Sequence, residues 1–171
     1  PSVSLPLAVC DLAGLADPPL LLVAPRDPSR AGEIAARAAA LGLKATRRSL
    51  GEGPTGGVWI VDSFGEMGIW YRICPVAVIG GTYGATEGHN PWEAAALGSA
   101  ILHGPRTANF AGDFSVLDSA GAALPVTPED LGAALLADHS KMAAKARALS
   151  DAAQGALEPL AHELLALAGS R

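Results

Sequence analysis

The chain lacks the features that mark several large classes of protein. Its 12 Lys and Arg residues never form a cluster of more than two neighbours, and its net charge is −5, so nothing in it resembles the basic surface of a nucleic-acid-binding protein. No apolar run approaches the roughly 20 residues that cross a bilayer. Residues 1–10 have no charged start before their apolar stretch, which argues against a signal peptide. We therefore expect no nucleic-acid partner and no membrane-spanning segment.

Cysteine is scarce, and no site for a metal or a nucleophile is visible. Cys10 and Cys74 lie in apolar sequence without metal-ligating neighbours, which is typical of buried thiols in a reducing compartment and makes a disulfide the less favoured alternative. There is no Asp-x-Asp pair, no His/Cys cluster and no arrangement of nucleophile, base and acid. His103 and His139 are interpreted as surface or helix-end groups, and His162 as solvated. We expect no metal and no cofactor.

Apolar sequence, by contrast, is abundant, at 50% of 171 residues. A chain of this size buries roughly two-thirds of its unfolded surface, which predicts a single domain over residues 1–171. Residues 1–19 are poorly patterned and are interpreted as an N-terminal arm, in which Leu5–Cys10 is either a strand or frayed. Residues 151–171 are interpreted as a C-terminal helix.

Short apolar runs alternate with alanine-rich helical patterns along the rest of the chain. The predicted strands are 20–24, 58–61, 76–79, 100–102 and 122–126, and residues 43–46 form a short, partly apolar run. The predicted helices are 28–41, 65–73, 91–97, 108–119 and 127–168, the last broken near His139 and Gly155. This order predicts an α/β fold with a Rossmann-like parallel sheet and helices on both faces. Ligands bind such sheets beyond the C-terminal ends of the strands.

The segment Val76–Glu93 reads as a strand, a glycine-rich loop and a helix that starts at Pro91. Glycines such as Gly81 let the backbone approach a ligand, and N–H groups at a helix start attract anions, so the loop is predicted to hold a phosphate. The pair His89-Asn90 places two polar side chains at the helix entrance. Glu93 lies one turn in and can accept hydrogen bonds from sugar hydroxyls. The alternative is a tight connection whose glycines only permit turns.

Two other polar segments follow predicted strands. Arg26 either forms a bidentate contact with a phosphate or carboxylate, or is an exposed side chain paired with Asp27. Asp62 and Ser63 either cap the next helix or precede a backbone segment, Ser63–Met67, that binds the edge of a base.

Several motifs occur in a fixed order. They are Pro25-Arg26-Asp27-Pro28-Ser29-Arg30, Arg47-Arg48-Ser49, Asp62-Ser63-Phe64-Gly65-Glu66-Met67-Gly68-Ile69-Trp70-Tyr71, Ile79-Gly80-Gly81, Gly88-His89-Asn90-Pro91-Trp92-Glu93, Gly104-Pro105 and Asn109-Phe110. Together they resemble the C-terminal domain of 3-deoxy-D-manno-octulosonic acid (Kdo) transferases over about residues 20 to 150. Gly-Glu-Met-Gly followed by Gly-His-Asn-Pro-x-Glu is specific to that family.

The resemblance implies one half of a GT-B glycosyltransferase, in which two Rossmann-like halves bind donor and acceptor across a cleft. It implies transfer of Kdo from CMP-Kdo to a lipid A precursor, with inversion and without a metal, in lipopolysaccharide biosynthesis. It implies a cytoplasmic location or the cytoplasmic face of the bacterial inner membrane. By the same resemblance, Arg26 contacts donor phosphate, residues 65–67 lie against the cytosine, Asn90 holds phosphate and Glu93 binds the ribose. The predicted substrate-binding residues are Arg26, Ser63, Gly65, Glu66, Met67, Gly81, His89, Asn90 and Glu93.

The chain departs from the family pattern in three respects. The acceptor half is missing with its membrane-association surface and general base, and residues 1–19 lack the Ser-Thr-His-x-Gly-Glu segment that opens the family's domain. Asp27 replaces a His, and Tyr83–Glu87 replaces a more basic or neutral loop. We expect weak binding of CMP or CMP-Kdo and no transfer by this chain alone. The first residue is Pro rather than Met, so we expect further sequence upstream.

Two other functional classes stay open. One is a degenerate nucleotide-sugar-binding module without turnover, and the other is a donor domain for a different nucleotide sugar. An upstream reading frame with an acceptor domain favours the transferase, whereas a native start near Pro1 favours the degenerate module. Comparing CMP with UDP and GDP in a thermal-shift assay separates the possible donors.

Overall fold

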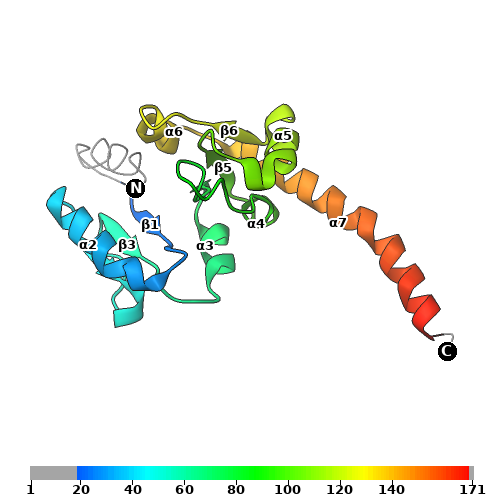
Figure 1. Ribbon diagram of the computed structural model, residues 1–171, viewed down its shortest axis with the longest axis horizontal. Coiled ribbons are helices and arrows are strands. Elements are labelled where there is room, and N and C mark those ends of the chain that lie inside the picture. Colours follow the sequence, from blue (N-terminus) through cyan, green and yellow to red (C-terminus); the bar gives the residue numbers. More distant parts are fainter. Residues whose placement is uncertain (1–18, 170–171) are drawn as a thin grey trace. The chain divides into compact units, whose positions relative to one another are not determined.

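The computed structural model describes residues 19–169, in which short strands alternate with helices (Figure 1). The elements are β1 (Leu21–Val23), η1 (Pro28–Arg30), α2 (Ala31–Ala40), β2 (Ala45–Arg47), η2 (Arg48–Leu50), β3 (Val58–Ile60), α3 (Met67–Ile73), β4 (Val76–Val78), α4 (Trp92–Leu97), β5 (Ala100–His103), η3 (Ala108–Phe110), α5 (Ala111–Ser119), β6 (Ala123–Pro125), α6 (Leu131–Leu136) and α7 (Ser140–Gly169). The predicted α/β class with Rossmann-like parallel strands is confirmed. Leu5–Cys10 lies outside the described residues.

The described strands pair in two parallel ladders of three, and each ladder belongs to a separate compact unit. Among the described residues, the first unit comprises 19–70 and 126–137, and the second comprises 71–125 and 138–169. The strand order is β1-β3-β2 in the first unit and β4-β5-β6 in the second. Alternation along the chain predicts parallel pairing, but it contains no signal that divides the strands between two ladders.

The core of the first unit lies between β3 and α2. Val58 and Ile60 of β3 are buried, and α2 brings Ala31 and Ala38 against them, because positions seven apart lie on one face of a helix. Alanine side chains at this contact let the helix approach the strand closely. Gly42, in the left-handed conformation at φ 75°, follows the end of α2.

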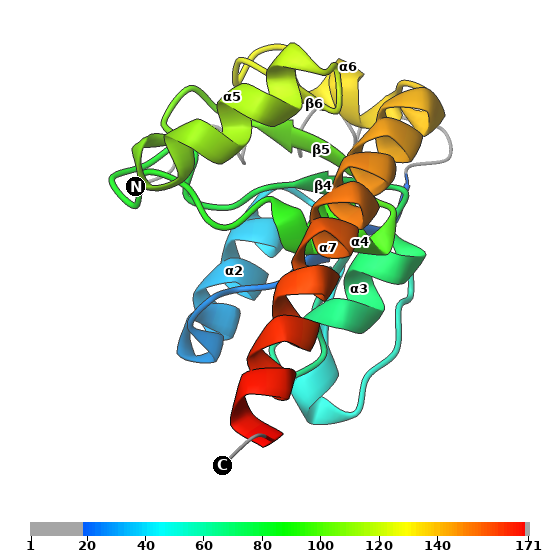
Figure 2. The ribbon, with the colours of Figure 1, turned by 90° about the vertical axis from the view of Figure 1, so that its right-hand side faces the viewer.

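The core of the second unit is built around β5, whose four residues are all buried. Ile101 packs with Phe114 and Leu117 of α5, with Ala95 of α4 and with Ala146 of α7. Small alanines again permit a close approach, here of two helices to the central strand. Figure 2 shows α7 lying alongside α4, and these two helices make the most extensive helix contact in the unit.

The helical run predicted at the end of the chain has one break rather than two. The break near His139 is confirmed, since three residues separate α6 from α7 and Asp138 Oδ1 accepts a hydrogen bond from the backbone N–H of Ser140 at 2.9 Å. The break at Gly155 is wrong, because α7 continues through it. A glycine costs a helix only about 1 kcal/mol relative to alanine, which a long helix tolerates.

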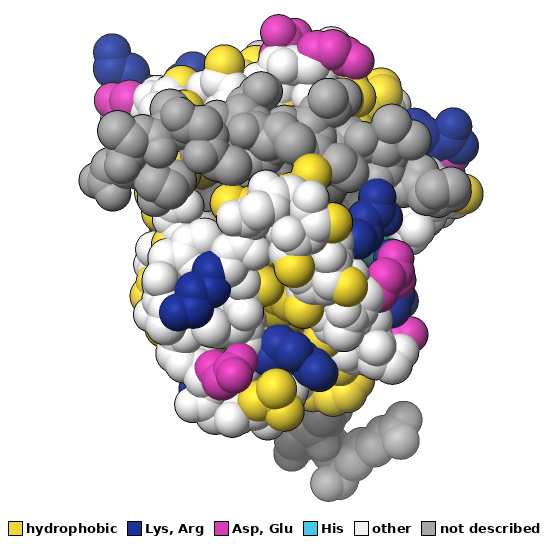
Figure 3. Space-filling view, turned by 90° about the vertical axis from the view of Figure 1, so that its left-hand side faces the viewer, with side chains coloured by type: hydrophobic (Ala, Val, Ile, Leu, Met, Phe, Trp, Pro, Cys, Tyr) yellow, Lys and Arg dark blue, Asp and Glu magenta, His cyan; other side chains and the backbone are white. Residues whose placement is uncertain are grey.

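The surface carries charges of both signs. On the face shown in Figure 3, the Lys and Arg side chains are scattered, and several stand beside Asp or Glu side chains. That face therefore has no continuous basic surface of the kind that binds nucleic acid. In the part of the chain that the structure describes, no helix is both long enough and apolar enough to span a bilayer.

Candidate functional site

The predicted site residues fall into two groups, and each group is described within its own unit. Arg26, Ser63, Gly65, Glu66 and Met67 belong to the first unit, whereas Gly81, His89, Asn90 and Glu93 belong to the second. Most of them lie on two segments that follow strands, here called the β3 loop (residues 61–66) and the β4 loop (residues 79–91).

Asp62 is a buried carboxylate that fixes the start of the β3 loop. Its side chain is 1% exposed and accepts hydrogen bonds from Arg47 Nε at 3.0 Å and Nη2 at 2.8 Å. The backbone N–H of Ser49, at 2.9 Å, and its hydroxyl, at 2.7 Å, complete the set. Burial alone would raise the pKa of Asp62, but these hydrogen bonds lower it to about 2. Asp62 was interpreted as a possible helix cap, and that is wrong because its two oxygens bind Arg47 of β2 and Ser49, which follows that strand.

Glu66 closes the same loop at its other end. Its carboxylate accepts a hydrogen bond from the Ser63 hydroxyl and a two-pronged pair from Arg48, with Nη2 2.8 Å from Oε1 and Nε 3.2 Å from Oε2. Hydrogen bonds from Arg48 and Ser63 lower the pKa of Glu66. The Arg48 guanidinium also lies 5.9 Å from the centroid of the Trp70 ring, within cation–π range. The Glu66 and Ser63 side chains are thus engaged within the protein.

The backbone of the β3 loop is therefore the part that is left to contact a ligand. Gly65 has φ 80°, a left-handed conformation that a side chain disfavours, and a Cβ there would meet nothing within 4 Å. Phe64 is 83% exposed and Met67 is 37% exposed, so apolar side chains flank this turn. A braced backbone turn beside an exposed aromatic ring suits the edge and face of a planar base.

Arg26 is exposed beyond the end of β1, whereas the neighbouring Asp27 is turned toward its own helix. Asp27 Oδ1 accepts a hydrogen bond from the backbone N–H of Ser29 at 3.0 Å and thereby caps η1. Hydrogen bonding from Ser29 lowers the pKa of Asp27. The carboxylate at this position thus has a structural partner of its own.

The β4 loop of the second unit is closed on itself and attached to the chain after β5. Thr82 is fully buried, and its hydroxyl donates to the carbonyl of Ile79 and accepts from the backbone N–H of Gly104, each at 2.8 Å. Gly88 N–H donates to the carbonyl of Gly81 at 3.2 Å. Gly81 has φ 78°, and a Cβ there would lie 3.0 Å from Thr86 Cβ, so glycine is required for both conformation and space.

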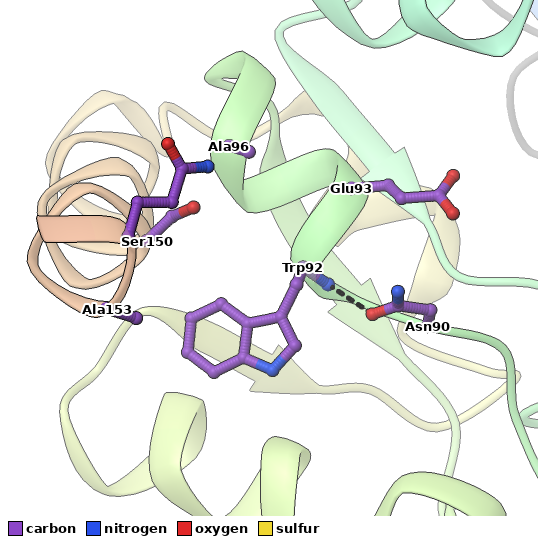
Figure 4. Close-up of a pocket in the computed structure, with 7 residues that line it drawn as sticks. Asn90, Trp92, Glu93, Ala96, Ser150 and Ala153 are labelled. Atoms are coloured by element: carbon purple, nitrogen blue, oxygen red, sulfur yellow. Dashed lines mark hydrogen bonds between the residues drawn. The ribbon is translucent and has the colours of Figure 1, made fainter. Parts of the chain in front are cut away.

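At the end of this loop, Asn90 precedes the N-cap residue Pro91 and pairs with a backbone N–H group in the first turn of α4. Its Oδ1 accepts a hydrogen bond from the backbone N–H of Trp92 at 2.9 Å, as the dashed line in Figure 4 shows. One of the N–H groups predicted to face an anion is therefore already paired, and the side-chain NH₂ of Asn90 is the group left to donate. His89 is half-buried and lies against Gly80, where a Cβ would come within 3.3 Å of the His89 ring.

Asn90 and Glu93 also line a hollow of about 380 Å³ between α4 and α7. The remaining lining residues are Trp92 and Ala96 of α4 with Ser150, Ala153 and Gln154 of α7. In Figure 4 the Glu93 carboxylate extends away from the Trp92 ring and from α7. Glu93 is exposed, and its charge adds to burial in raising the pKa of Tyr71. The carboxylate is thus accessible to a ligand's hydroxyl groups.

Comparison with known proteins identifies the family. The chain is 38% identical over 143 residues to 3-deoxy-D-manno-octulosonic acid transferase from Bordetella pertussis, covering 80% of this chain and 32% of that protein. It is 34% identical over 100 residues to the Haemophilus influenzae transferase. A solved structure, the C-terminal CMP-Kdo binding domain of WaaA from Acinetobacter baumannii, matches with a TM-score of 0.67 and 30% identity, covering 73% of this chain and 70% of that one. The chain belongs to the Kdo transferase family. No protein-family model matches it.

The chain spans about a third of the length of the Bordetella pertussis relative and less of the Haemophilus influenzae protein, of which 23% is covered. The expected resemblance to the family's C-terminal domain is thereby confirmed.

Sequence reasoning missed what Arg47 and Arg48 do in this member of the Kdo transferase family. They were noted only as part of a family motif, yet they hold the two ends of the β3 loop through Asp62 and Glu66. A signal was present, because two adjacent arginines end one parallel strand and two carboxylates follow the next. C-terminal ends of parallel strands meet at one sheet edge, which brings such opposite charges together.

His103 was interpreted as a surface or helix-end group, and that is wrong. It is 3% exposed, with Nδ1 2.8 Å from the carbonyl of Gly104 and Nε2 3.0 Å from Asp118 Oδ1. The ring lies 4.4 Å from that of Phe114. Burial extends to His103 because β5 runs one residue further than predicted. Cys74 is a half-buried free thiol whose pKa is raised by burial, and Cys10 lies outside the described residues.

Both groups of predicted site residues contain chemical groups that can bind a ligand. They supply an exposed guanidinium, an exposed carboxylate and braced backbone turns. Among residues 19–169, no group of three or more His, Cys, Asp or Glu side chains is placed to hold a metal ion. These residues suit recognition of phosphate, ribose and base.

Proposed function

We propose that this chain is the donor-binding domain of a Kdo transferase and that it binds CMP-Kdo and CMP. The observation that carries the proposal is the match to the C-terminal CMP-Kdo binding domain of WaaA, with a TM-score of 0.67 and 30% identity over 73% of this chain. At that identity the similarity extends beyond the fold to the sequence. The family motifs of this chain supply the candidate contacts for each part of the nucleotide.

In this proposal Arg26 contacts the donor phosphate, and its exposure beyond β1 supports that role. The cytosine lies against residues 63–67, where Gly65, Glu66 and Met67 form the turn. The engagement of the Ser63 and Glu66 side chains within the protein makes backbone groups the base-reading atoms here.

In the same proposal, the β4 loop contacts the phosphate of the donor. Gly81 allows the loop's tight turn, while His89 and the NH₂ group of Asn90 donate to phosphate oxygens. Glu93 accepts hydrogen bonds from the ribose hydroxyls, a role supported by its exposed carboxylate in the first turn of α4. Each proposed contact uses a different chemical group of CMP.

For the whole protein we propose transfer of Kdo from CMP-Kdo to a lipid A precursor, with inversion and without a metal, at the cytoplasmic face of the inner membrane. Departure of CMP leaves an oxocarbenium-like sugar and a growing negative charge on the phosphate. Fixed donors such as Arg26 and Asn90 stabilise that charge more in the transition state than in the ground state. The acceptor and the general base are assigned to sequence beyond this chain, which spans about a third of its relative.

Isothermal titration of the chain with CMP tests the proposal. We expect CMP to bind and UDP and GDP to bind more weakly. Arg26→Ala and Glu93→Gln should each weaken CMP binding by about tenfold, because each removes a charge-assisted hydrogen bond. Arg147→Ala is the control, since Arg147 is an exposed arginine paired with Asp151. Absence of CMP binding at millimolar concentration, or unchanged affinity in both site variants, would overturn the assignment.

A second assay addresses turnover. Incubation of this chain with CMP-Kdo and a lipid A precursor should release no CMP, because the proposed acceptor half and base are not part of it. Addition of the missing half, or expression of the longer reading frame, should restore transfer. Transfer by the chain alone would show that it carries a base that the present assignment lacks.

A further inference from the structure

The β4 loop is attached to the segment that follows β5 by contacts that no predicted site residue makes. The segment that follows β5 consists of residues 104–107, here called the β5 loop, and of η3. Besides the Thr82 hydroxyl that joins Ile79 to Gly104, the backbone N–H of Arg106 donates to the carbonyl of Thr82 at 2.9 Å. A Cβ at Gly104 would lie 2.4 Å from the Thr82 carbonyl oxygen, so the two loops touch at backbone distance.

The Arg106 side chain extends this attachment across the loop. Its Nε donates to the carbonyl of Gly84 at 3.0 Å, and its Nη2 pairs with the Glu87 carboxylate. A planar guanidinium makes both contacts at once in a fixed geometry, which lysine does not reproduce. Arg106 thus fixes the distance between the middle of the β4 loop and its C-terminal part, three residues before Asn90.

Asn109 of η3 holds the same part of the loop from the other side. Its backbone N–H donates to the carbonyl of Glu87 at 3.0 Å, and its side-chain NH₂ donates to the carbonyl of Thr86. Glu87 needs such support because its φ of 58° is left-handed, a conformation that non-glycine residues rarely adopt. Gly88 follows directly and is buried against Thr107 and Phe114.

The Arg106 pair also changes the electrostatics of the loop. Glu87 is the acidic residue of this loop, and its carboxylate is 29% exposed, three residues before Asn90. An unpaired carboxylate there would repel an anionic ligand, whereas the Arg106 guanidinium cancels its charge. The acidic side chain and the cationic side chain that neutralises it are therefore contributed by two different loops.

We propose that Arg106 and Asn109 are positioning residues for the donor site: they hold the β4 loop in the shape that presents His89, Asn90 and Glu93, and Arg106 neutralises Glu87 so that the anionic donor can approach. This inference rests on the proposed function. Neither residue touches the ligand. They act by fixing the backbone conformation of the β4 loop, and Arg106 also acts by neutralising the charge of Glu87.

The test measures CMP affinity by titration at 15 °C in low and high salt, for Arg106→Gln, Asn109→Ala and the double variant Arg106→Gln/Glu87→Gln. We expect Arg106→Gln to weaken binding by about tenfold, with the larger loss at low salt, where the uncompensated Glu87 is least screened. The double variant should recover the salt-dependent part of the loss only. Asn109→Ala should weaken binding with no added salt dependence.

Arg147→Ala is the matched control, since Arg147 and Arg106 are each 52% exposed and each pairs with one carboxylate. A merely structural role for Arg106 would lower the melting temperature and leave affinity and salt dependence unchanged, which would overturn the inference. Should Arg106→Gln fail to fold, Asn109→Ala and Glu87→Gln carry the same test, the latter expected to strengthen CMP binding at low salt. If the wild-type chain does not bind CMP, the proposed function fails; if it binds CMP and all variants bind equally, only this inference fails.

Discussion

The β3 loop and the β4 loop are both held by arginine side chains, but the ion pairs involved differ in how deeply they are buried. Each loop follows a parallel strand, and each is held by arginine from a neighbouring part of the same unit: Arg47 at the end of β2 with Arg48 directly after it, and Arg106 after β5. We call these two sets of arginine contacts the β3 brace and the β4 brace. The first brace ends on Asp62, whose side chain is 1% exposed, whereas the second joins two partly exposed side chains. A buried carboxylate with all its hydrogen bonds made is costly to disturb, and an exposed pair is not. The β3 brace should therefore contribute mainly to the stability of the fold, and the β4 brace should mainly affect the affinity for the ligand.

The largest expected effect follows replacement of Asp62 by alanine. This change leaves Arg47 and the Ser49 N–H without their acceptor, and it should lower the free energy of unfolding by about 3 kcal/mol. Urea denaturation measures the change. Asp151→Ala is the control, because Asp151 also pairs with an arginine but is 57% exposed, and its loss should stay below about 1 kcal/mol. Equal losses in the two variants would contradict the contrast between a buried and an exposed brace.

Glycine has a different role in the β5 loop, at Gly104, and in the β3 loop, at Gly65. Two alanine substitutions distinguish these roles. Gly104→Ala places a Cβ 2.4 Å from the Thr82 carbonyl oxygen and should cost about 2 to 3 kcal/mol through backbone displacement. Gly65→Ala meets no atom within 4 Å and should cost only the left-handed conformation, about 1 to 2 kcal/mol. Thermal unfolding compares them with Gly112→Ala, an open helical position that should not be destabilised. A larger loss at Gly65 than at Gly104 would reverse the interpretation.

The pH dependence of the free energy of unfolding should also reveal the contribution of the buried Asp62 carboxylate. The pKa of Asp62 is lowered from 3.8 to about 2 in the folded protein, so the unfolded chain binds its proton first as the pH falls. The stabilisation by Asp62 is therefore complete above about pH 4 and is lost as the pH falls toward 2. Urea unfolding at pH 5, 4 and 3 should show this loss, and Asp62→Asn should flatten the profile over that interval. An unchanged profile in the variant would assign the acid sensitivity to other carboxylates, such as Glu66.

The smallest effect is expected at Glu87. Glu87→Gly relieves a left-handed conformation worth about 1 kcal/mol, and it removes a partly exposed ion pair worth about the same or less. Stability should change by no more than about 1 kcal/mol, while the affinity for CMP should change with salt concentration. A loss comparable to that of Asp62→Ala would mean that both braces stabilise the fold equally.

The sequence predicted the features that depend on neighbouring residues. Strands and helices followed from local apolar patterns, and the break predicted near His139 is stabilised by a local contact, in which Asp138 accepts a hydrogen bond from Ser140. The family motifs were equally local. Each of them could be recognised without knowing what lies across the fold.

What the sequence did not predict depends on partners that are distant along the chain. Asp62 was misread as a cap because its partner Arg47 lies 15 residues earlier, on another strand. His103 was misread because its burial depends on Phe114 and Asp118 of α5. The division of the strands into two ladders has no local signal at all, since every strand in both ladders is parallel.

The central claim, that this chain recognises CMP through both loops, is tested most directly by titrating isotopically labelled chain with CMP and following its amide NMR signals. We predict shifts at residues 63–67 and at residues 81–93, with residues 131–136 of α6 unchanged. Shifts confined to α6, or no shifts at millimolar CMP, would contradict this claim.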